Sequence, residues 1–151
     1  MKKISVCAFL VLAIFLTTCK KYPDGPAFSL RSAKARIAHS VWAVEYYEVN
    51  NIDSTSFFLL KPHIDSCENS FQFYAGSDYT SISGCTFGDW GLMDNNKIIS
   101  INASKNFDPS PFVKSGSLKW NILRLTIKEF WIETDYSGNH YKVKLKAIKQ
   151  I

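Results

Sequence analysis

Four cysteines are the residues of this chain with the most distinctive chemistry. Cys67 precedes one predicted strand and Cys85 follows the next, so a hairpin would bring the two thiols together. An oxidising compartment favours a disulfide between them, and closing the loop of 19 residues would contribute about 3 kcal/mol to stability. A metal site formed by these cysteines with His63 and Asp65 is the alternative, but the paired C-x-x-C spacing of zinc sites is absent. We therefore predict a Cys67–Cys85 disulfide, no metal site and no cofactor.

The remaining titratable residues form no recognisable catalytic motif. His39, His63 and His140 have no neighbouring nucleophile in a G-x-S-x-G setting, and the sequence lacks both a Gly-rich phosphate loop and H-E-x-x-H. Glu133 and Asp135 would share one face of a strand. Acid–base chemistry is one use of such a pair, but we favour the interpretation that they form the polar face of the strand. We predict that the protein is not an enzyme.

Cys19 is set apart from the other cysteines by what precedes it. Met1-Lys2-Lys3 is a basic start, and Ile4 to Leu16 is an apolar run of 13 residues, shorter than the roughly 20 that span a bilayer. This order is typical of a secretory signal peptide. The end of the run, Leu16-Thr17-Thr18-Cys19, resembles the lipobox of bacterial lipoproteins. The resemblance implies that residues 1–18 are removed, and that Cys19 is lipidated and becomes the first residue.

This interpretation predicts where the protein resides. Residues 19–28, with Pro23, Gly25 and Pro26, would form a tether between lipid and domain. Several acyl chains give a stable anchor, and we expect the outer membrane of a bacterial envelope, facing the periplasm or the outside. Loss of Lys2 and Lys3 would lower the formal net charge from +5 to +3. That charge is too small to indicate a nucleic-acid partner.

Residues 29–151 have the pattern of a single all-β domain. Near-helical spacing predicts a short helix or turn within residues 29–40. Beyond it, β-branched and aromatic residues alternate with polar ones and are separated by turn signals. An antiparallel meander of this kind hides its edges best by closing into a barrel of about eight strands. The predicted strands are residues 41–49, 56–61, 70–74, 79–83, 88–93, 97–102, 118–126, 128–134 and 140–148.

The last two strands have the most clearly defined faces. Lysines at every second position of the final strand would occupy its solvent face, since a slip of one residue would bury them. Phe130, Ile132 and Thr134 of the preceding strand should look inward. The inward residues of the final strand are Tyr141, Val143, Leu145 and Ala147, and the outward ones are Lys142, Lys144 and Lys146.

Aromatic residues on the inner face are the candidates for contact with a ligand. With a polar mouth they could line a pocket, or they could fill the barrel as solid core; the sequence leaves both alternatives open. The candidate ligand-lining residues are Trp42, Val44 and Tyr46 on the first strand, with Phe71, Phe73 and Trp90 on later strands. A solid barrel would instead use loops such as residues 105–117.

Three segments resemble bacterial lipocalin-like lipoproteins. They are "YPDGPAFSLRSAKARIAHSVWAVEYYEVNNID", "CENSFQFYAGSDYTSISGCTFGDWGLMDNNKIISI" and "NILRLTIKEFWIET". The resemblance implies a lipocalin-like β-barrel anchored to a membrane through its N-terminal lipid. It also implies the binding or carriage of a small, partly apolar molecule. A structural or protein-interaction module with an unidentified envelope partner is the alternative.

Overall fold

The computed structural model describes residues 21–25, 30–56, 70–75, 80–84, 88–103 and 116–151. Within these residues, no helix combines the length and the apolar character needed to cross a bilayer. Cys19, Cys67 and Cys85 lie outside the described residues, as does most of the strand predicted at 56–61. The elements are α2 (Ala33–Ala38), β1 (Ser40–Val49), β2 (Ile52–Asp53), β3 (Ser70–Ala75), β4 (Thr80–Gly84), β5 (Gly88–Met93), the 3-10 helix η1 (Asp94–Asn96), β6 (Ile98–Ala103), β7 (Gly116–Leu125), β8 (Glu129–Tyr136) and β9 (Asn139–Gln150).

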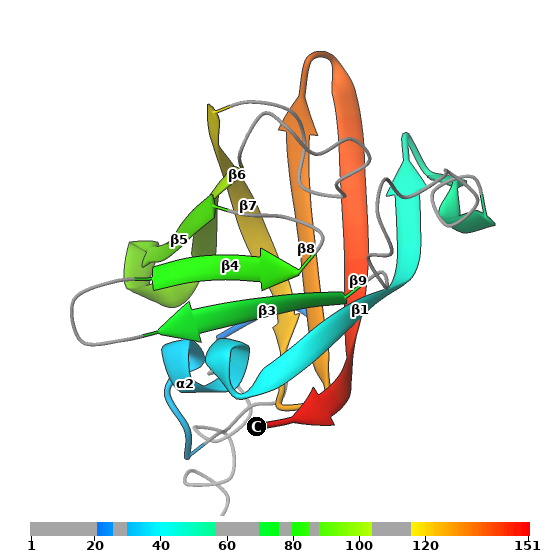
Figure 1. The fold of residues 1–151 in the computed structure, drawn as a ribbon. Coiled ribbons are helices and arrows are strands. Elements are labelled where there is room, and N and C mark those ends of the chain that lie inside the picture. The colour runs from blue at the N-terminus through cyan, green and yellow to red at the C-terminus, as the bar shows by residue number, and fades with distance from the viewer. Residues whose placement is uncertain (1–20, 26–29, 57–69, 76–79, 85–87, 104–115) are drawn as a thin grey trace, which may run out of the picture.

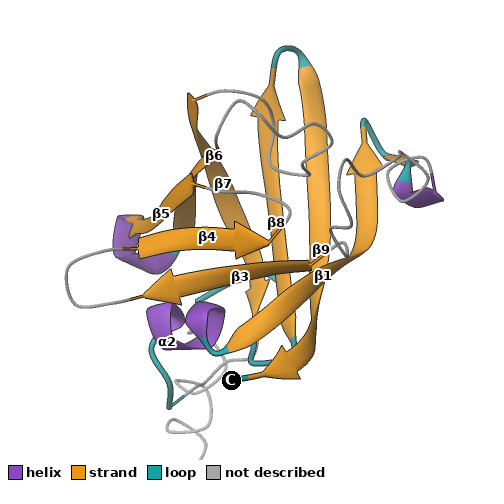
Figure 2. Cartoon of the chain, in the orientation of Figure 1, coloured by secondary structure: helices purple, strands orange, loops and turns teal. Residues whose placement is uncertain are grey.

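The strands form one antiparallel sheet that closes on itself (Figures 1 and 2). Neighbours follow sequence order from β3 to β9, and β1 pairs with β3 on one edge and with β9 on the other. Eight strands therefore make the ring, and β2 adds a short hairpin to the far end of β1. The pairing of β4 with β5 is limited to Ile82 and Gly88. The prediction of an all-β, up-and-down meander of about eight strands is confirmed.

Tight turns at left-handed residues connect several of these strands. Asn50 and Asn51, between β1 and β2, have φ of 53° and 64°, and Ser137 and Gly138, between β8 and β9, have φ of 50° and 79°. Positive φ at both central residues is the geometry of two-residue hairpins that match the twist of the strands. Asparagine and glycine tolerate it best, so these turns follow directly from the sequence.

Helix α2 lies against one end of the barrel (Figure 2). The Ser32 hydroxyl caps it by accepting a hydrogen bond from the Ala35 N–H at 3.1 Å. Ile37 is fully buried, and its carbonyl accepts a hydrogen bond from the Trp42 indole N–H at 2.8 Å. Arg36 is also buried and donates to the Leu125 carbonyl at the end of β7. The helix thus joins the beginning of β1 to the end of β7.

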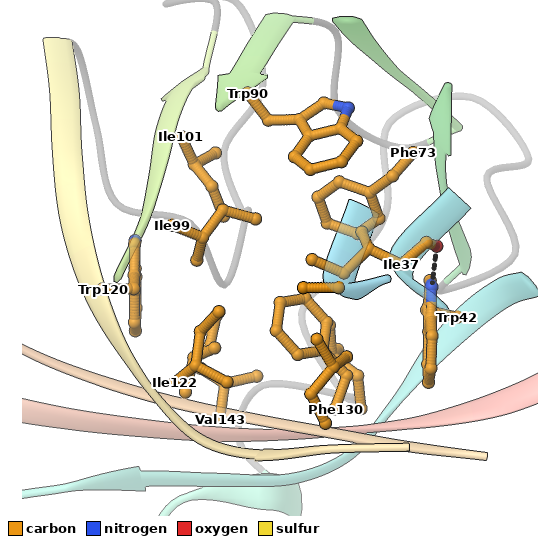
Figure 3. Close-up of a cluster of buried hydrophobic side chains, with 14 of the residues drawn as sticks. Ile37, Trp42, Phe73, Trp90, Ile99, Ile101, Trp120, Ile122, Phe130 and Val143 are labelled. Carbon is orange, nitrogen blue, oxygen red and sulfur yellow. Dashed lines mark hydrogen bonds between the residues drawn. The ribbon is translucent and has the colours of Figure 1, made fainter. Parts of the chain in front are cut away.

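The core fills the space inside the ring. In Figure 3 the side chains of Ile99, Ile101 and Trp120 lie on one side of the interior, opposite those of Ile37 and Phe73. The pattern predicted for β8 is confirmed, because Phe130, Ile132 and Thr134 are buried. The alternation predicted for β9 is also confirmed. Its buried residues are Val143 and Leu145, and its half-buried ones on the same face are Tyr141 and Ala147.

Residues 21–25, which fall within the predicted tether of residues 19–28, pack against the barrel wall. Tyr22 is 1% exposed, and its hydroxyl donates to the Asn96 carbonyl at 3.0 Å. The Asp24 N–H donates to the Leu123 carbonyl at 2.9 Å, and Arg124 donates back to the Asp24 carbonyl. Burial is the main cause that raises the pKa of the Tyr22 phenol. Sequence composition could not reveal this contact, because it joins residues far apart in the chain.

The packing of Tyr22 predicts a measurable stability cost. Tyr22→Ala should lower the free energy of unfolding in urea by about 3 kcal/mol, since it removes a fully buried ring. Tyr22→Phe should lower it by about 1 kcal/mol, because only the hydrogen bond is lost. Equal stability of Tyr22→Ala and the wild type would show that the segment does not pack on the barrel.

Candidate functional site

Solvent exposure of the inner face changes from one end of the barrel to the other. Near α2, the side chains of Trp42 and Leu145 have no exposed surface. Because a void large enough for water would expose the atoms lining it, this end is packed solid. At the opposite end, Tyr47, Leu118 and Tyr141 are half-buried although they pack against the same core. We call the end at α2 the base, and the end formed by Tyr47, Leu118 and Tyr141 the mouth.

Four of the predicted ligand-lining residues belong to the sealed part of the barrel. Trp42 and Phe73 are 0% exposed, Trp90 is 4% exposed and Val44 is 7% exposed. The Phe130 ring packs edge-on against Trp42 and Phe73, with centroid distances of 5.7 and 5.9 Å. Phe73 makes a similar contact of 5.7 Å with Trp90. The structure brings these residues together as core. Phe71 lies on β3, but its side chain is outside the described part of the structure.

The prediction that Tyr46 shares the inner face with Trp42 and Val44 is wrong. Val44 pairs with Leu145 of β9, whereas Tyr46 pairs with Lys144, the very next residue of that strand. Glu45 is therefore an extra residue in β1, which is the definition of a β-bulge. Beyond the bulge the alternation is reversed: Tyr46 faces outward and Tyr47 faces the interior. The alternation of inward and outward residues expected from the sequence gives no sign of an extra residue such as Glu45.

Tyr46 instead joins a group of stacked side chains on the outer wall. The Lys144 ammonium lies 4.7 Å from the ring centroids of both Tyr46 and Trp131, and the Arg124 guanidinium lies 5.2 Å from that of Trp131. The Tyr46 hydroxyl donates to Glu48 at 2.6 Å, and this bond raises the pKa of Tyr46 to about 12. These cation–π contacts stabilise the wall, and Trp131 receives one from each of its neighbouring strands, β7 and β9.

The mouth combines aromatic surface with polar groups. The rings of Tyr47 and Tyr141 lie 6.4 Å apart, between centroids, at an interplanar angle of 47°. Tyr141 is paired with Val49 of β1 and Thr134 of β8, and the Thr134 hydroxyl is committed to the Lys119 carbonyl at 2.7 Å. A tyrosine presents a broad apolar ring and a hydroxyl that can donate or accept. This combination suits a small molecule that is partly apolar.

Asn50 locks the two hairpins that support the mouth. Its N–H donates to the His140 carbonyl, and its side-chain oxygen accepts from the His140 N–H, both at 2.8 Å. Its side-chain nitrogen donates to the Asn139 side chain, also at 2.8 Å. The following residues secure Tyr47, since Thr55 accepts from the Tyr47 N–H at 2.9 Å. The Asn50-Asn51 pair was recognisable as a turn signal, but its pairing with the distant β8–β9 hairpin was not.

Carboxylates near His140 give the mouth an acidic rim. One ring nitrogen of His140 lies 2.9 Å from Asp135, and the other lies 3.7 Å from Glu133. Among the described residues, no group of three or more histidine, cysteine or acidic side chains is arranged to hold a metal ion. His140 and Asp135 are within hydrogen-bond distance at the edge of the mouth, whereas His140 and Glu133 are at ion-pair distance.

A recess lies on the outer wall, between the packed N-terminal segment and η1. It encloses about 260 Å³ and is open to solvent. Lys21, Lys97 and Glu133 contribute charged groups to its lining, and Ile98 and Leu123 contribute apolar ones. The aromatic side chains of the mouth are not part of it.

Comparison with known proteins gives a likeness of fold only. No protein-family model and no curated protein matches the chain. One solved structure with a similar fold is a lipocalin-like protein from Bacteroides uniformis, with a TM-score of 0.47 and 17% sequence identity. The match covers 74% of this chain and 98% of that chain. Inferences about function therefore rest on the residues of this chain.

Substitution of Asn50 separates two contributions to the stability of the mouth: the tolerance of this residue for positive φ, and the hydrogen bonds of its side chain. Asn50→Ala should lower the free energy of unfolding by about 2 kcal/mol, because it combines strain at positive φ with lost hydrogen bonds. Asn50→Gly relieves the strain and should cost about 1 kcal/mol. Amide hydrogen exchange of His140 should accelerate in both variants and remain slow in Asn51→Gly. Slow exchange in all three would contradict the proposed lock.

Proposed function

We propose that this protein is a lipid-anchored lipoprotein of the bacterial cell envelope that binds a small, partly apolar molecule at the barrel mouth. The anchor would be acylated Cys19 after removal of residues 1–18, and the outer membrane is the proposed location, with the domain in the periplasm or at the cell surface. The role is binding or carriage, without catalysis.

The anchor is supported by the order of features in the sequence. A basic start, an apolar run too short to span a bilayer and the Leu16-Thr17-Thr18-Cys19 box follow one another. Among the described residues, packing against the domain begins at Tyr22, only three positions after Cys19. A lipid at Cys19 would therefore hold the domain directly against the membrane.

The single observation that carries the binding proposal is the exposure gradient along the inner face. Residues of the base are sealed, whereas Tyr47, Leu118 and Tyr141 keep accessible apolar and aromatic surface above them. A ligand would therefore rest on the core and contact the mouth residues. It would not penetrate to Trp42 or Phe73. Pockets of this type have apolar walls and a few polar groups that orient the ligand.

A second candidate function is supported by the packing of the base. A barrel whose interior is solid around Trp42, Phe73 and Leu145 has no need of a ligand for its own stability. Such a barrel could act as a structural or interaction module that contacts an envelope protein through its surface. The two functions differ in one property, namely whether an apolar molecule binds at the mouth.

The anchor is tested by labelling cells with radioactive palmitate. Cys19→Ala should abolish labelling and release the protein from the membrane fraction, because the acceptor thiol is gone. Cys7→Ala, a matched change within the predicted signal peptide, should leave labelling intact. Labelled Cys19→Ala protein would refute the anchor.

Mouth binding is tested by titrating the acylated protein in detergent with the apolar dye Nile red. Tyr141→Ser should weaken dye binding about tenfold or more, since it removes an aromatic wall of the site. Tyr74→Ser is the matched control, because Tyr74 is 38% exposed on β3 and does not belong to the mouth. Urea unfolding should confirm that both variants remain folded. Dye binding that is absent, or equal in the two variants, would contradict the proposal and favour the surface module.

A further inference from the structure

We infer that the base of the barrel is a membrane-contacting surface for anionic phospholipid headgroups, so that the mouth points away from the bilayer. The inference rests on the proposed acylation of Cys19 and adds to it an orientation, a contact surface and a lipid class. It is carried by the packing of Tyr22, by the exposed residues around α2, and by the distribution of charge between the two ends.

The reach of the chain limits how far the domain can stand from its anchor. Tyr22 is fixed to the barrel by burial and by its hydrogen bond to Asn96. Three peptide units separate it from Cys19, and even a fully extended chain covers about 3.6 Å per residue, or about 11 Å. The acyl chains enter the bilayer at Cys19. The part of the barrel near Tyr22 must therefore lie within about that distance of the headgroups.

The base carries an exposed group of apolar and basic side chains. Leu30 is 92% exposed three residues before α2 begins, and Ile148 is 57% exposed near the end of β9. Isolated exposed apolar residues need no explanation, but here Arg31 follows Leu30 and Lys149 follows Ile148, the combination found at membrane-surface segments. We define the basal face as Leu30, Arg31, Lys34, Lys128, Ile148 and Lys149, all of which are exposed.

Backbone contacts hold the segments of the basal face together. The Ala147 N–H donates to the Lys128 carbonyl at 2.9 Å, which places the β7–β8 turn beside the end of β9. The Ile151 N–H donates to the carbonyl of His39, the residue that ends α2, at 2.7 Å. Figure 1 shows α2, the end of β9 and the β7–β8 connection at the same end of the barrel. The basal face is therefore one surface built from three parts of the chain.

Charge complementarity points to an anionic bilayer as the occupant. Four of the six basal residues are cationic. Of the nearby acidic residues in the described part of the chain, Glu129 is paired with Arg124 at 2.8 Å, and Asp24 lies in the packed segment. The described turns at the mouth have the opposite character, with Asp53 and Asp135 and no lysine or arginine in residues 50–54 or 135–140. Each basic residue near an anionic membrane surface raises membrane affinity about fivefold.

The orientation is tested by photocrosslinking with the full-length, acylated protein in vesicles of phosphatidylglycerol and phosphatidylcholine. The photoreactive residue p-benzoyl-phenylalanine replaces either Leu30 or Ile52. Both are exposed apolar residues, at 92% and 68%, and they lie at opposite ends of the barrel. A phospholipid adduct should form several-fold more efficiently at position 30. Equal adducts, or a preference for position 52, would overturn the inference.

The role of charge is tested with matched pairs of neutralised lysines. Lys128→Gln with Lys149→Gln should reduce the adduct at position 30 toward its yield in pure phosphatidylcholine vesicles. Lys119→Gln with Lys142→Gln, on the outer wall away from the base, should leave the yield unchanged. Equal effects of both pairs would refute a specific basal contact.

Intact mass measurement separates this inference from the anchor. If the mass shows no acyl chains, the anchor proposal has failed. The comparison of positions 30 and 52 on anionic vesicles then decides whether the basal face binds lipid by itself: a preference for position 30 supports the contact, and no preference overturns it.

Discussion

The pairing of β1 with β9 is the constraint on which the rest of the structure depends. It converts an open meander into a ring, and it runs from Ser40 opposite Gln150 to Val49 opposite Tyr141. Without it, both strands would present unpaired backbone groups at the edges of the sheet. Closure gives the inner face its shared core and places Tyr47 beside Tyr141. It also brings the α2 end of β1 next to the end of β9, where the basal face is assembled.

The two ends of this ring are built differently. At the base, α2 covers the interior, and the Trp42 indole is held by the Ile37 carbonyl within a cluster of fully buried aromatic rings. At the mouth, two hairpins joined through Asn50 hold half-buried tyrosines above that core. Because the base is sealed and the mouth is accessible to solvent, the barrel has a defined direction from base to mouth. A lipid anchor close to Tyr22 would align that direction with the membrane normal.

Much of the fold could be predicted from local sequence, because alternation and turn residues act over a few positions. The inward faces of β8 and β9 and the asparagine and glycine turns belong to this group. The prediction of Tyr46 as an inner residue failed because the bulge at Glu45 is specified by pairing with β9, which leaves no local mark. The packing of Tyr22 and the hydrogen bonds of Asn50 connect residues more than seventy positions apart, so no local pattern could reveal them. The residues of the candidate site were the hardest to predict, because the site lies where these long-range contacts meet.

Native mass spectrometry of the acylated protein, extracted gently from its own cell envelope, tests the central claim most directly. We expect the mass of the acylated chain together with a discrete additional mass that is lost on denaturation, because a molecule resting on the mouth tyrosines is held without covalent bonds. A spectrum that contains only the acylated chain, with no bound molecule under conditions that preserve the fold, would contradict the claim that this barrel carries a ligand.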